Sequence, residues 1–375
     1  MPRRAWIALV AVLALACSDP TGADDEEPDP GPDINDPVPH ANGIYYPESC
    51  AEPPSSIELV GHLELPESLT DLWAYYDEET GREYALAGYN TGIAEGGVYV
   101  IDVTDPADPT LSATLDEAGV NDVVVWMNYA YTVSGHEEHG DLGIIYDLSD
   151  PAAPVVVDSF PSGHNLFITE RGYMYKAEEG VQAFDLVPDP TDPEPIWTDA
   201  RDSGHDVAVI GDTLLDFHAF DGTILYDISD PFDPVEGLTL DDDSVRFHHS
   251  GWLSGDGRYL YIHDELPMNL NQNADISIWD LDTGERVGSY RDTTSTVHNG
   301  YELCDRLAVS YYTRGFVLFD ISDPTELVPL DEYDTDPDAE GEGFFLGAWG
   351  VYPYTRSGNV LVSDVEKGLY VFRLE

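Results

Sequence analysis

The sequence predicts an all-β protein, a seven-bladed β-propeller whose last blade is completed by an N-terminal strand. The first observation is a short apolar segment ending in Asp that recurs along the 375-residue chain. Successive copies lie 38 to 53 residues apart, a spacing typical of propellers and solenoids. The residues that mark the copies are Asp102, Asp147, Asp185, Asp227, Asp280, Asp320 and, in the last copy, Arg373.

The second observation is that each repeat holds four short runs of β-forming residues. In the fourth repeat these runs are residues 205–210, 213–217, 223–226 and 235–240, with Asp221-Gly222 between the second and third. Asp-Gly between two such runs indicates a β-hairpin. Because no segment shows the 3.6-residue period of an amphipathic helix, the repeats indicate propeller blades rather than a helical solenoid.

The third observation concerns the two ends of the repeat array. Residues 368–374 read as a third strand with no fourth strand after them, and residues 56–65 form an orphan run before the first repeat. If this orphan run completes the last blade, the ring closes without an exposed strand edge. We therefore expect seven blades over residues 51–375.

The N-terminal residues resemble an export signal. Two arginines precede an apolar run, residues 5–16, that is too short to span a bilayer. The run ends in Leu-Ala-Leu-Ala-Cys at Cys17, which resembles the lipobox of bacterial lipoproteins and implies lipidation of Cys17. We expect residues 1–16 to be a lipoprotein signal peptide and the protein to be extracytoplasmic, anchored to the cell envelope at the outer membrane or cell surface. An ordinary secretory signal is the alternative.

Residues 17–50 are acidic and Pro-rich, and we expect them to form an extended tether after the lipidated cysteine. The whole chain has 74 acidic and 15 basic residues, a formal charge of −59. Such a charge repels nucleic acid and anionic lipid, so we expect no nucleic-acid partner and membrane contact through the lipid anchor only. It suits divalent cations or basic partners, or serves solubility alone.

The segment after the third strands reads Asp-Leu/Ile-Ser-Asp-Pro-x-x-Pro at residues 147–154 and 227–234. It resembles the repeat of the LVIVD-repeat family of secreted and surface β-propellers, over about residues 56–375. The pattern is lost at residues 282–284 and at Arg373. The resemblance implies a propeller in an extracytoplasmic setting. We interpret the Asp-Pro segments as structural turns, in which Asp accepts backbone N–H groups, rather than as calcium sites.

Histidines gather on one face of the predicted propeller. First strands line the central channel, and four consecutive first strands begin with His164, His205, His249 (or His248) and His298. Loops between second and third strands on the same face add carboxylates, including those of Glu137, Asp264 and Glu265. Imidazoles and carboxylates that converge on a channel mouth are ligands for a divalent transition metal such as zinc, iron, copper or manganese.

Two interpretations of these histidines remain open. Four histidines from separate blades resemble the arrangement that holds iron in carotenoid-cleaving oxygenases, an analogy of architecture alone. WD-repeat propellers instead place a Gly-His pair at this loop, where the imidazole bonds inside its own blade, and the Gly-His pairs at His164 and His205 look similar. The first interpretation predicts one metal held by the four histidines, with Asp264, Glu265 or Glu137 as candidate catalytic groups.

Cys50 precedes the closing N-terminal strand, and Cys304 follows the first strand of the sixth repeat. Both are expected on the face opposite to the histidines, so we expect a disulfide between them, with two separate thiols as the alternative.

A binding or scaffold module explains these observations best. It would hold a protein, glycan or small-molecule ligand on the channel-mouth face, with one divalent transition metal as an additional feature. The alternative is a metal-dependent enzyme, an oxidoreductase or hydrolase, that uses the His cluster. The lack of serine-nucleophile and phosphate-loop motifs weighs against an enzyme.

Overall fold

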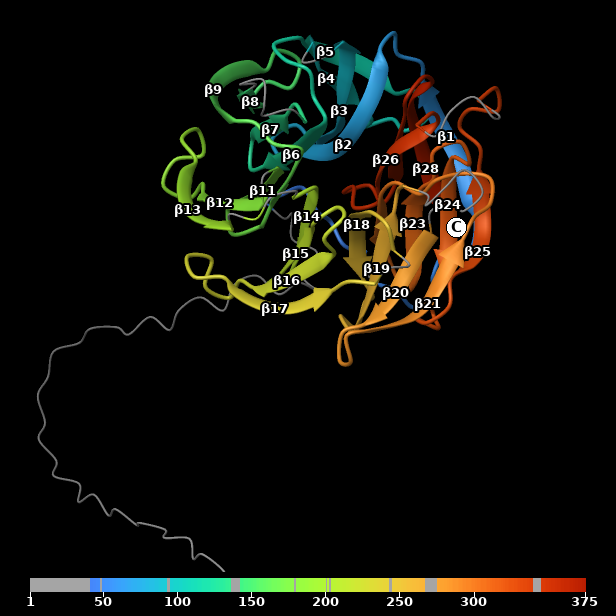
Figure 1. The fold of residues 1–375 in the computed structure, drawn as a ribbon. Coiled ribbons are helices and arrows are strands. Elements are labelled where there is room, and N and C mark those ends of the chain that lie inside the picture. Colours follow the sequence, from blue (N-terminus) through green and yellow to red (C-terminus); the bar gives the residue numbers. More distant parts are fainter. Residues whose placement is uncertain are drawn as a thin grey trace, which may run out of the picture. The chain divides into compact units, whose positions relative to one another are not determined.

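The computed structural model describes residues 41–375 except 48, 93–94, 136–141, 179, 200, 202–203, 243–244, 267–274 and 340–344. The described residues form seven four-stranded antiparallel sheets arranged as a propeller (Figure 1). The predicted fold class is therefore confirmed. None of the described segments is a helix able to span a membrane. The predicted signal peptide, Cys17, most of the predicted tether and Glu137 lie outside the described residues.

Blades 1 to 6 each consist of four strands that are consecutive in the chain, with the first strand nearest the axis. Blades 1 to 3 contain β2 (Ser68–Asp77), β3 (Arg82–Gly92), β4 (Glu95–Asp102), β5 (Thr110–Leu115); β6 (Asp122–Trp126), β7 (Tyr129–Val133), β8 (Leu142–Asp147), β9 (Val155–Pro161); and β10 (Asn165–Ile168), β11 (Tyr173–Glu178), β12 (Gly180–Asp185), β13 (Glu194–Asp199). Blades 4 to 6 contain β14 (Asp206–Ile210), β15 (Thr213–Phe217), β16 (Thr223–Asp227), β17 (Val235–Leu240); β18 (His248–Leu253), β19 (Tyr259–Asp264), β20 (Asp275–Asp280), β21 (Glu285–Arg291); and β22 (Gly300–Glu302), β23 (Arg306–Ser310), β24 (Phe316–Asp320), β25 (Val328–Tyr333). Blade 7 contains β26 (Ala348–Tyr352), β27 (Val360–Asp364), β28 (Gly368–Leu374) and β1 (Ile57–Leu63).

The ring closes by pairing the two ends of the propeller. Strand β1 is antiparallel to β28, with Ile57 opposite Leu374 and Leu63 opposite Leu369 (Figure 1). Each first strand also contacts the first strands of both neighbouring blades, including β26 against β2. The N-terminal strand therefore completes the last blade, as the sequence predicts.

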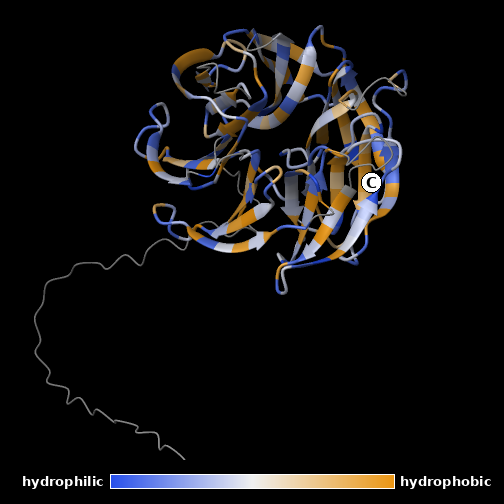
Figure 2. Ribbon diagram, viewed as in Figure 1, coloured by the Kyte–Doolittle hydropathy of each residue, from blue (hydrophilic) through white to orange (hydrophobic). Residues whose placement is uncertain are grey.

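The core lies between blades rather than within them. In blade 2, the innermost strand β6 is buried along its whole length. The outermost strand of the same sheet, β9, is exposed at six of seven positions. Figure 2 shows apolar residues concentrated on strands and hydrophilic residues on many of the connecting loops. Inner strands are covered on both faces by adjacent blades, so their sequences are nearly continuous apolar runs.

The marker Asp of each repeat ends the third strand of its blade and shapes the turn that follows. In blades 1 to 6 its Oδ1 accepts a hydrogen bond from the backbone N–H two residues later, at 2.8–2.9 Å. The Asp of the first Asp-Pro pair after the marker does the same in blades 1 to 4 and 6, as in Asp150 with Ala152 and Asp230 with Phe232. These contacts support the structural interpretation of the Asp-Pro segments.

Residues 41–47, which we call the N-terminal strap, pack against the propeller. The backbone oxygen of Asn42 accepts a hydrogen bond from Trp73 Nε1 at 2.7 Å, and that of Gly43 accepts one from Tyr352 Oη at 2.7 Å. The Asn42 side chain donates to the Ile168 oxygen, and Ile44 is buried. The strap thus contacts blades 1, 3 and 7, and the packed chain begins before the boundary predicted at residue 51.

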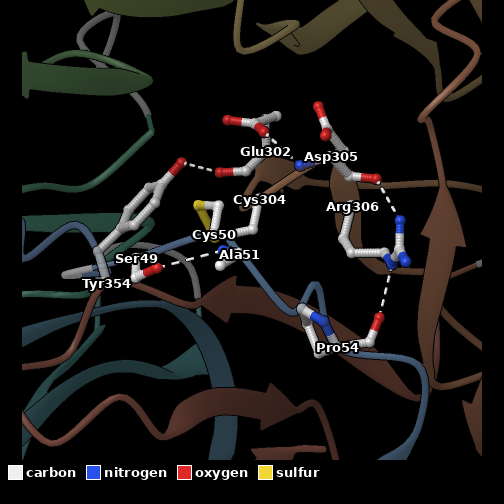
Figure 3. The surroundings of a disulfide bond; sticks show 9 residues. All are labelled: Ser49, Cys50, Ala51, Pro54, Glu302, Cys304, Asp305, Arg306 and Tyr354. Atoms are coloured by element: carbon white, nitrogen blue, oxygen red, sulfur yellow. Dashed lines mark hydrogen bonds between the residues drawn. A yellow bond between two sulfur atoms is a disulfide. The ribbon is translucent and has the colours of Figure 1, made fainter.

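Cys50 and Cys304 form a disulfide across 254 residues of sequence (Figure 3). It joins the segment that leads into β1 to the turn after β22 of blade 6. In the same region Arg306 donates to the Pro54 oxygen, and Tyr354 Oη donates to the Glu302 oxygen, both at 2.5 Å. The disulfide therefore fixes the chain just before the closing strand.

Candidate functional site

Three equivalent positions recur at the first strand of every blade. We name the three sets of residues at these positions the mouth, middle and floor layers. The mouth layer is Thr70, Asn121, His164, His205, His249, His298 and Trp349. The middle layer, one residue later, is Asp71, Asp122, Asn165, Asp206, Ser250, Asn299 and Gly350. The floor layer, two residues further, is Trp73, Val124, Phe167, Ala208, Trp252, Tyr301 and Tyr352. Side chains two residues apart on a strand point to the same side, so most middle and floor residues line one cavity.

The four predicted histidines form a continuous arc across blades 3 to 6. Ring centroids are 4.1 Å apart between His164 and His205, 4.6 Å between His205 and His249, and 4.4 Å between His249 and His298. His249, rather than His248, takes its place in the arc. These imidazoles therefore contact one another between blades, unlike the own-blade bonding of the WD-type interpretation.

Two carboxylates lie between the imidazoles of the arc. Asp206 Oδ1 lies 3.0 Å from His205 Nδ1, and its Oδ2 lies 3.9 Å from His249 Nδ1. Glu265 Oε2 lies 3.7 Å from His249 Nε2, and its Oε1 lies 3.8 Å from His298 Nε2. Glu265 follows β19 and belongs to the predicted carboxylates, whereas Asp206, the first residue of β14, is a member of the candidate site that the sequence did not predict.

The N···O separations around His249 are too long for hydrogen bonds. Two ligands of one ion, each bound at roughly 2.1 Å, are roughly 3.4 Å apart at a tetrahedral angle and roughly 4.2 Å apart when opposite. The observed 3.7 and 3.9 Å fall within this range. Among the described residues, His249 Nδ1 and His205 Nδ1 are buried and have no hydrogen-bond partner, since the 3.0 Å contact of His205 with Asp206 is not oriented as a hydrogen bond.

Burial controls the protonation of the arc. It lowers the pKa of His205 to about 4 and that of His298 to about 3, and it lowers the pKa of His249 well below its usual value. Burial also raises the pKa of Asp206 and that of Glu265 to about 7. The imidazoles of His205, His249 and His298 are therefore neutral at pH 7, so their contacts with the carboxylates are not ion pairs, and their lone pairs can serve as metal ligands.

Neighbouring groups hold the arc in place. His298 Nδ1 lies 2.7 Å from the Trp349 oxygen, and Tyr312 Oη donates to Glu265 Oε1 at 2.7 Å. Tyr312 has a φ of 30°, in the left-handed region that non-glycine residues rarely adopt, and its backbone bridges to Ala348 of the next blade. This strained position directs the phenol toward Glu265.

Two buried charged residues fix the loops that carry the histidines. Lys176 Nζ donates to the oxygens of Pro161 and Ser162, directly before His164. Asp264, predicted as a catalytic candidate, accepts hydrogen bonds from the backbone N–H groups of Arg246 and Phe247. The structure thus gives Asp264 a positioning contact with the loop before His249. The role of Lys176 was not apparent from the sequence.

Other histidines of this face have local partners. His248 Nδ1 lies 2.8 Å from Thr223 Oγ1, His263 Nδ1 lies 2.8 Å from Ser250 Oγ, and His218 Nδ1 lies 3.2 Å from Asp216. These contacts tie strands and loops together.

Below the arc, the middle layer holds Asp71 and Asp122, which are both fully enclosed. Asp71 accepts from Asn299 Nδ2 at 2.7 Å, and Asp122 accepts from Asn165 Nδ2 at 2.9 Å. Burial raises the pKa of Asp122 to about 7 and raises the pKa of Asp71 well above its usual value. Folding therefore favours the protonated acids.

The raised pKa values of Asp71 and Asp122 contribute stability that is lost between about pH 4 and pH 7, whereas the lowered pKa values of the arc histidines contribute in the opposite sense below about pH 6.5. The unfolded chain ionises from about pH 4, while the folded protein keeps the proton of Asp122 up to about pH 7. We expect the melting temperature of wild type minus that of Asp122→Asn to fall on the order of 5 °C between pH 5 and pH 8, because the variant lacks the Asp122 contribution and keeps that of the histidines. Calorimetry in 0.5 M NaCl, which screens surface repulsion, measures both proteins. A difference that does not change with pH would contradict the assignment.

The floor layer closes the other end of the channel. Trp73 lies 4.6 Å from Tyr352 and 6.0 Å from Phe167, and Trp252 lies 4.8 Å from Tyr301, between ring centroids. The N-terminal strap covers this floor through its bonds to Trp73 and Tyr352. The cavity is therefore approached from the histidine side.

Comparison with protein families finds LVIVD repeats in this chain. The repeat model matches residues 91–117, 119–161 and 309–335, about a quarter of the sequence. The second match spans all of blade 2, and the others cover the third and fourth strands of blades 1 and 6. No curated protein matches the chain.

Proposed function

We propose that this protein is a binding module of the cell envelope whose binding site is the channel mouth, and that this site holds a divalent transition metal. His205, His249 and Glu265 would be its ligands, because their ligand atoms lie within 4.8 Å of one another. The proposed anchor at Cys17 and the extracytoplasmic location depend on the sequence of residues 1–17 alone.

The position of His249 carries the proposal. Its side chain is buried, and both ring nitrogens face carboxylate oxygens at separations of 3.7 and 3.9 Å. A buried polar atom without a partner costs roughly 1–3 kcal/mol. An ion bound to the unpartnered Nδ1 of His205, one of the proposed ligands, would offset this cost, and the acidic surface would attract cations to the mouth.

The donor set indicates which metals fit. Two imidazoles and one carboxylate suit zinc, iron, copper or manganese better than calcium or magnesium, which prefer oxygen ligands only. Three protein ligands also leave coordination positions open toward the mouth. A protein, glycan or small molecule with a suitable donor group would bind there.

Metal content of the purified full chain, made soluble by Cys17→Ser, tests the proposal. After incubation with zinc, iron, copper or manganese and gel filtration in 0.5 M NaCl with excess Mg²⁺, we expect at least one ion per chain. The double variant His205→Ala/His249→Ala should lose it, while His62→Ala, which changes a histidine outside the arc, should keep it. Equal metal content in wild type and double variant would sink the proposal.

A metal-dependent enzyme is the second candidate, and the donor set favours it. Two histidines and a glutamate with open positions form the pattern of catalytic zinc and non-haem iron sites. Glu265, with a pKa raised to about 7 by burial, could exchange a proton at neutral pH. If cobalt-loaded protein changes its visible spectrum on adding azide, a position open to substrate exists; an unchanged spectrum favours the binding module.

A further inference from the structure

We infer that the channel mouth holds two metal ions, in two ligand sets that share His205; this inference rests on the proposed function. The first set is His164, His205 and Asp206, and the second is His205, His249 and Glu265. Within each set the ligand atoms lie no more than 4.8 Å from one another.

The length of the arc argues against a single ion. Four rings follow one another at centroid spacings of 4.1 to 4.6 Å, from His164 to His298. A metal binds imidazole nitrogen at roughly 2.1 Å, so one ion reaches two or three of these rings but not both ends of the arc. Glu265 has one oxygen facing His249 and the other facing His298, which places it at the second ion rather than the first.

Charge balance supports two ions. Asp71, Asp122, Asp206 and Glu265 are four buried carboxyl groups around this end of the channel. Among the described residues, no lysine or arginine forms an ion pair with any of them. Two divalent ions would supply positive charge to the two carboxylates of the ligand sets, Asp206 and Glu265, and buried charges without a partner are costly.

Binding of two ions at once requires a change in the protonation of the shared histidine, His205. An imidazole has two ring nitrogens, and both can ligate metals once the remaining N–H proton is lost. The second ion therefore displaces one proton from His205 to solvent, and the resulting imidazolate bridges the two ions. His205 lies between His164 and His249 in the arc, at centroid distances of 4.1 and 4.6 Å.

The stoichiometry of Cu²⁺ or Zn²⁺ bound to the soluble full chain tests the inference. Under the conditions above we expect two ions per wild-type chain, one in His164→Ala, one in Glu265→Gln and two in the control His62→Ala. Calorimetry in buffers of different ionisation enthalpy should show one more proton released for the second ion in wild type. Electron paramagnetic resonance of the dicopper protein should show the weakened signal of coupled ions, and His164→Ala should show the full signal of one.

The outcomes separate the inference from the proposed function. One ion in wild type that is unaffected by His164→Ala would overturn the first set, which contains His164, and leave the set of His205, His249 and Glu265. No ion in wild type would overturn both. If His164→Ala misfolds, the number of ions bound to wild type and to Glu265→Gln still tests the inference, because neither protein carries the His164 substitution.

Discussion

Removal of the Cys50–Cys304 disulfide should lower the free energy of unfolding by about 5 kcal/mol. The bond closes a loop of 254 residues, and in the chain-entropy model a loop of this length restricts the unfolded state by about that amount. Domains are usually stable by only about 5–15 kcal/mol, so this is a large fraction. The backbone also holds Cys304 and Asp305 at positive φ, a conformation the disulfide helps to fix.

The double variant Cys50→Ser/Cys304→Ser, made in the Cys17→Ser chain, measures this effect by denaturant unfolding. Wild type treated with a reductant should lose the same stability, and the reductant should not affect the double variant. A loss below 1 kcal/mol would show that β1–β28 pairing and the N-terminal strap close the ring without the disulfide.

Replacing the N-terminal strap by a Gly/Ser segment of equal length should cost about 5 kcal/mol. Burial of the Ile44 side chain contributes about 2 kcal/mol. Without the Ile44 and Asn42 side chains we expect the segment to detach, so that Trp73 Nε1 and Tyr352 Oη lose their backbone partners and the Ile168 oxygen loses the Asn42 amide, at about 1 kcal/mol each. Trp73 would also become accessible to water, so its fluorescence emission should shift to longer wavelength.

Ile44→Ala and Asn42→Ala, made separately, resolve these contributions. We expect about 2–3 kcal/mol for the first and about 1 kcal/mol for the second. The matched control replaces residues 34–40, outside the strap, with the same Gly/Ser composition and should leave stability unchanged. A strap replacement that unfolds at the wild-type denaturant concentration would mean that the floor layer closes the channel unaided.

Much of the fold could be predicted because its signals are local and repeated. The marker Asp, the turn residues and the apolar runs each act within one blade, and seven copies make the pattern clear. Closure by β1 followed from a count of strands. The strap could not be found in this way, because residues 41–47 have no periodic pattern and their contacts are with distant blades.

The candidate site was predicted in part. The four histidines could be found because each begins a first strand, and the structure brings them together. Asp206 was missed because a single Asp after His205 belongs to no motif. Comparing first strands with one another would have revealed it, since Asp71 and Asp122 occupy the same position in blades 1 and 2. Lys176 acts through backbone oxygens of a neighbouring loop, which leaves no trace in its own repeat.

Because β1 pairs with β28, the ring can close only after β28 has been synthesised. Strand β28 is synthesised about 300 residues after β1, which corresponds to about 15–60 s of translation at about 5–20 residues per second. Throughout this interval β1 has no partner, and the growing array ends in an open sheet edge. A helical solenoid gains stability with each repeat added, but this ring reaches its closed state in one late step. A nascent chain of six blades is thus still an unfinished fold, and the last strand made gives the first strand its partner.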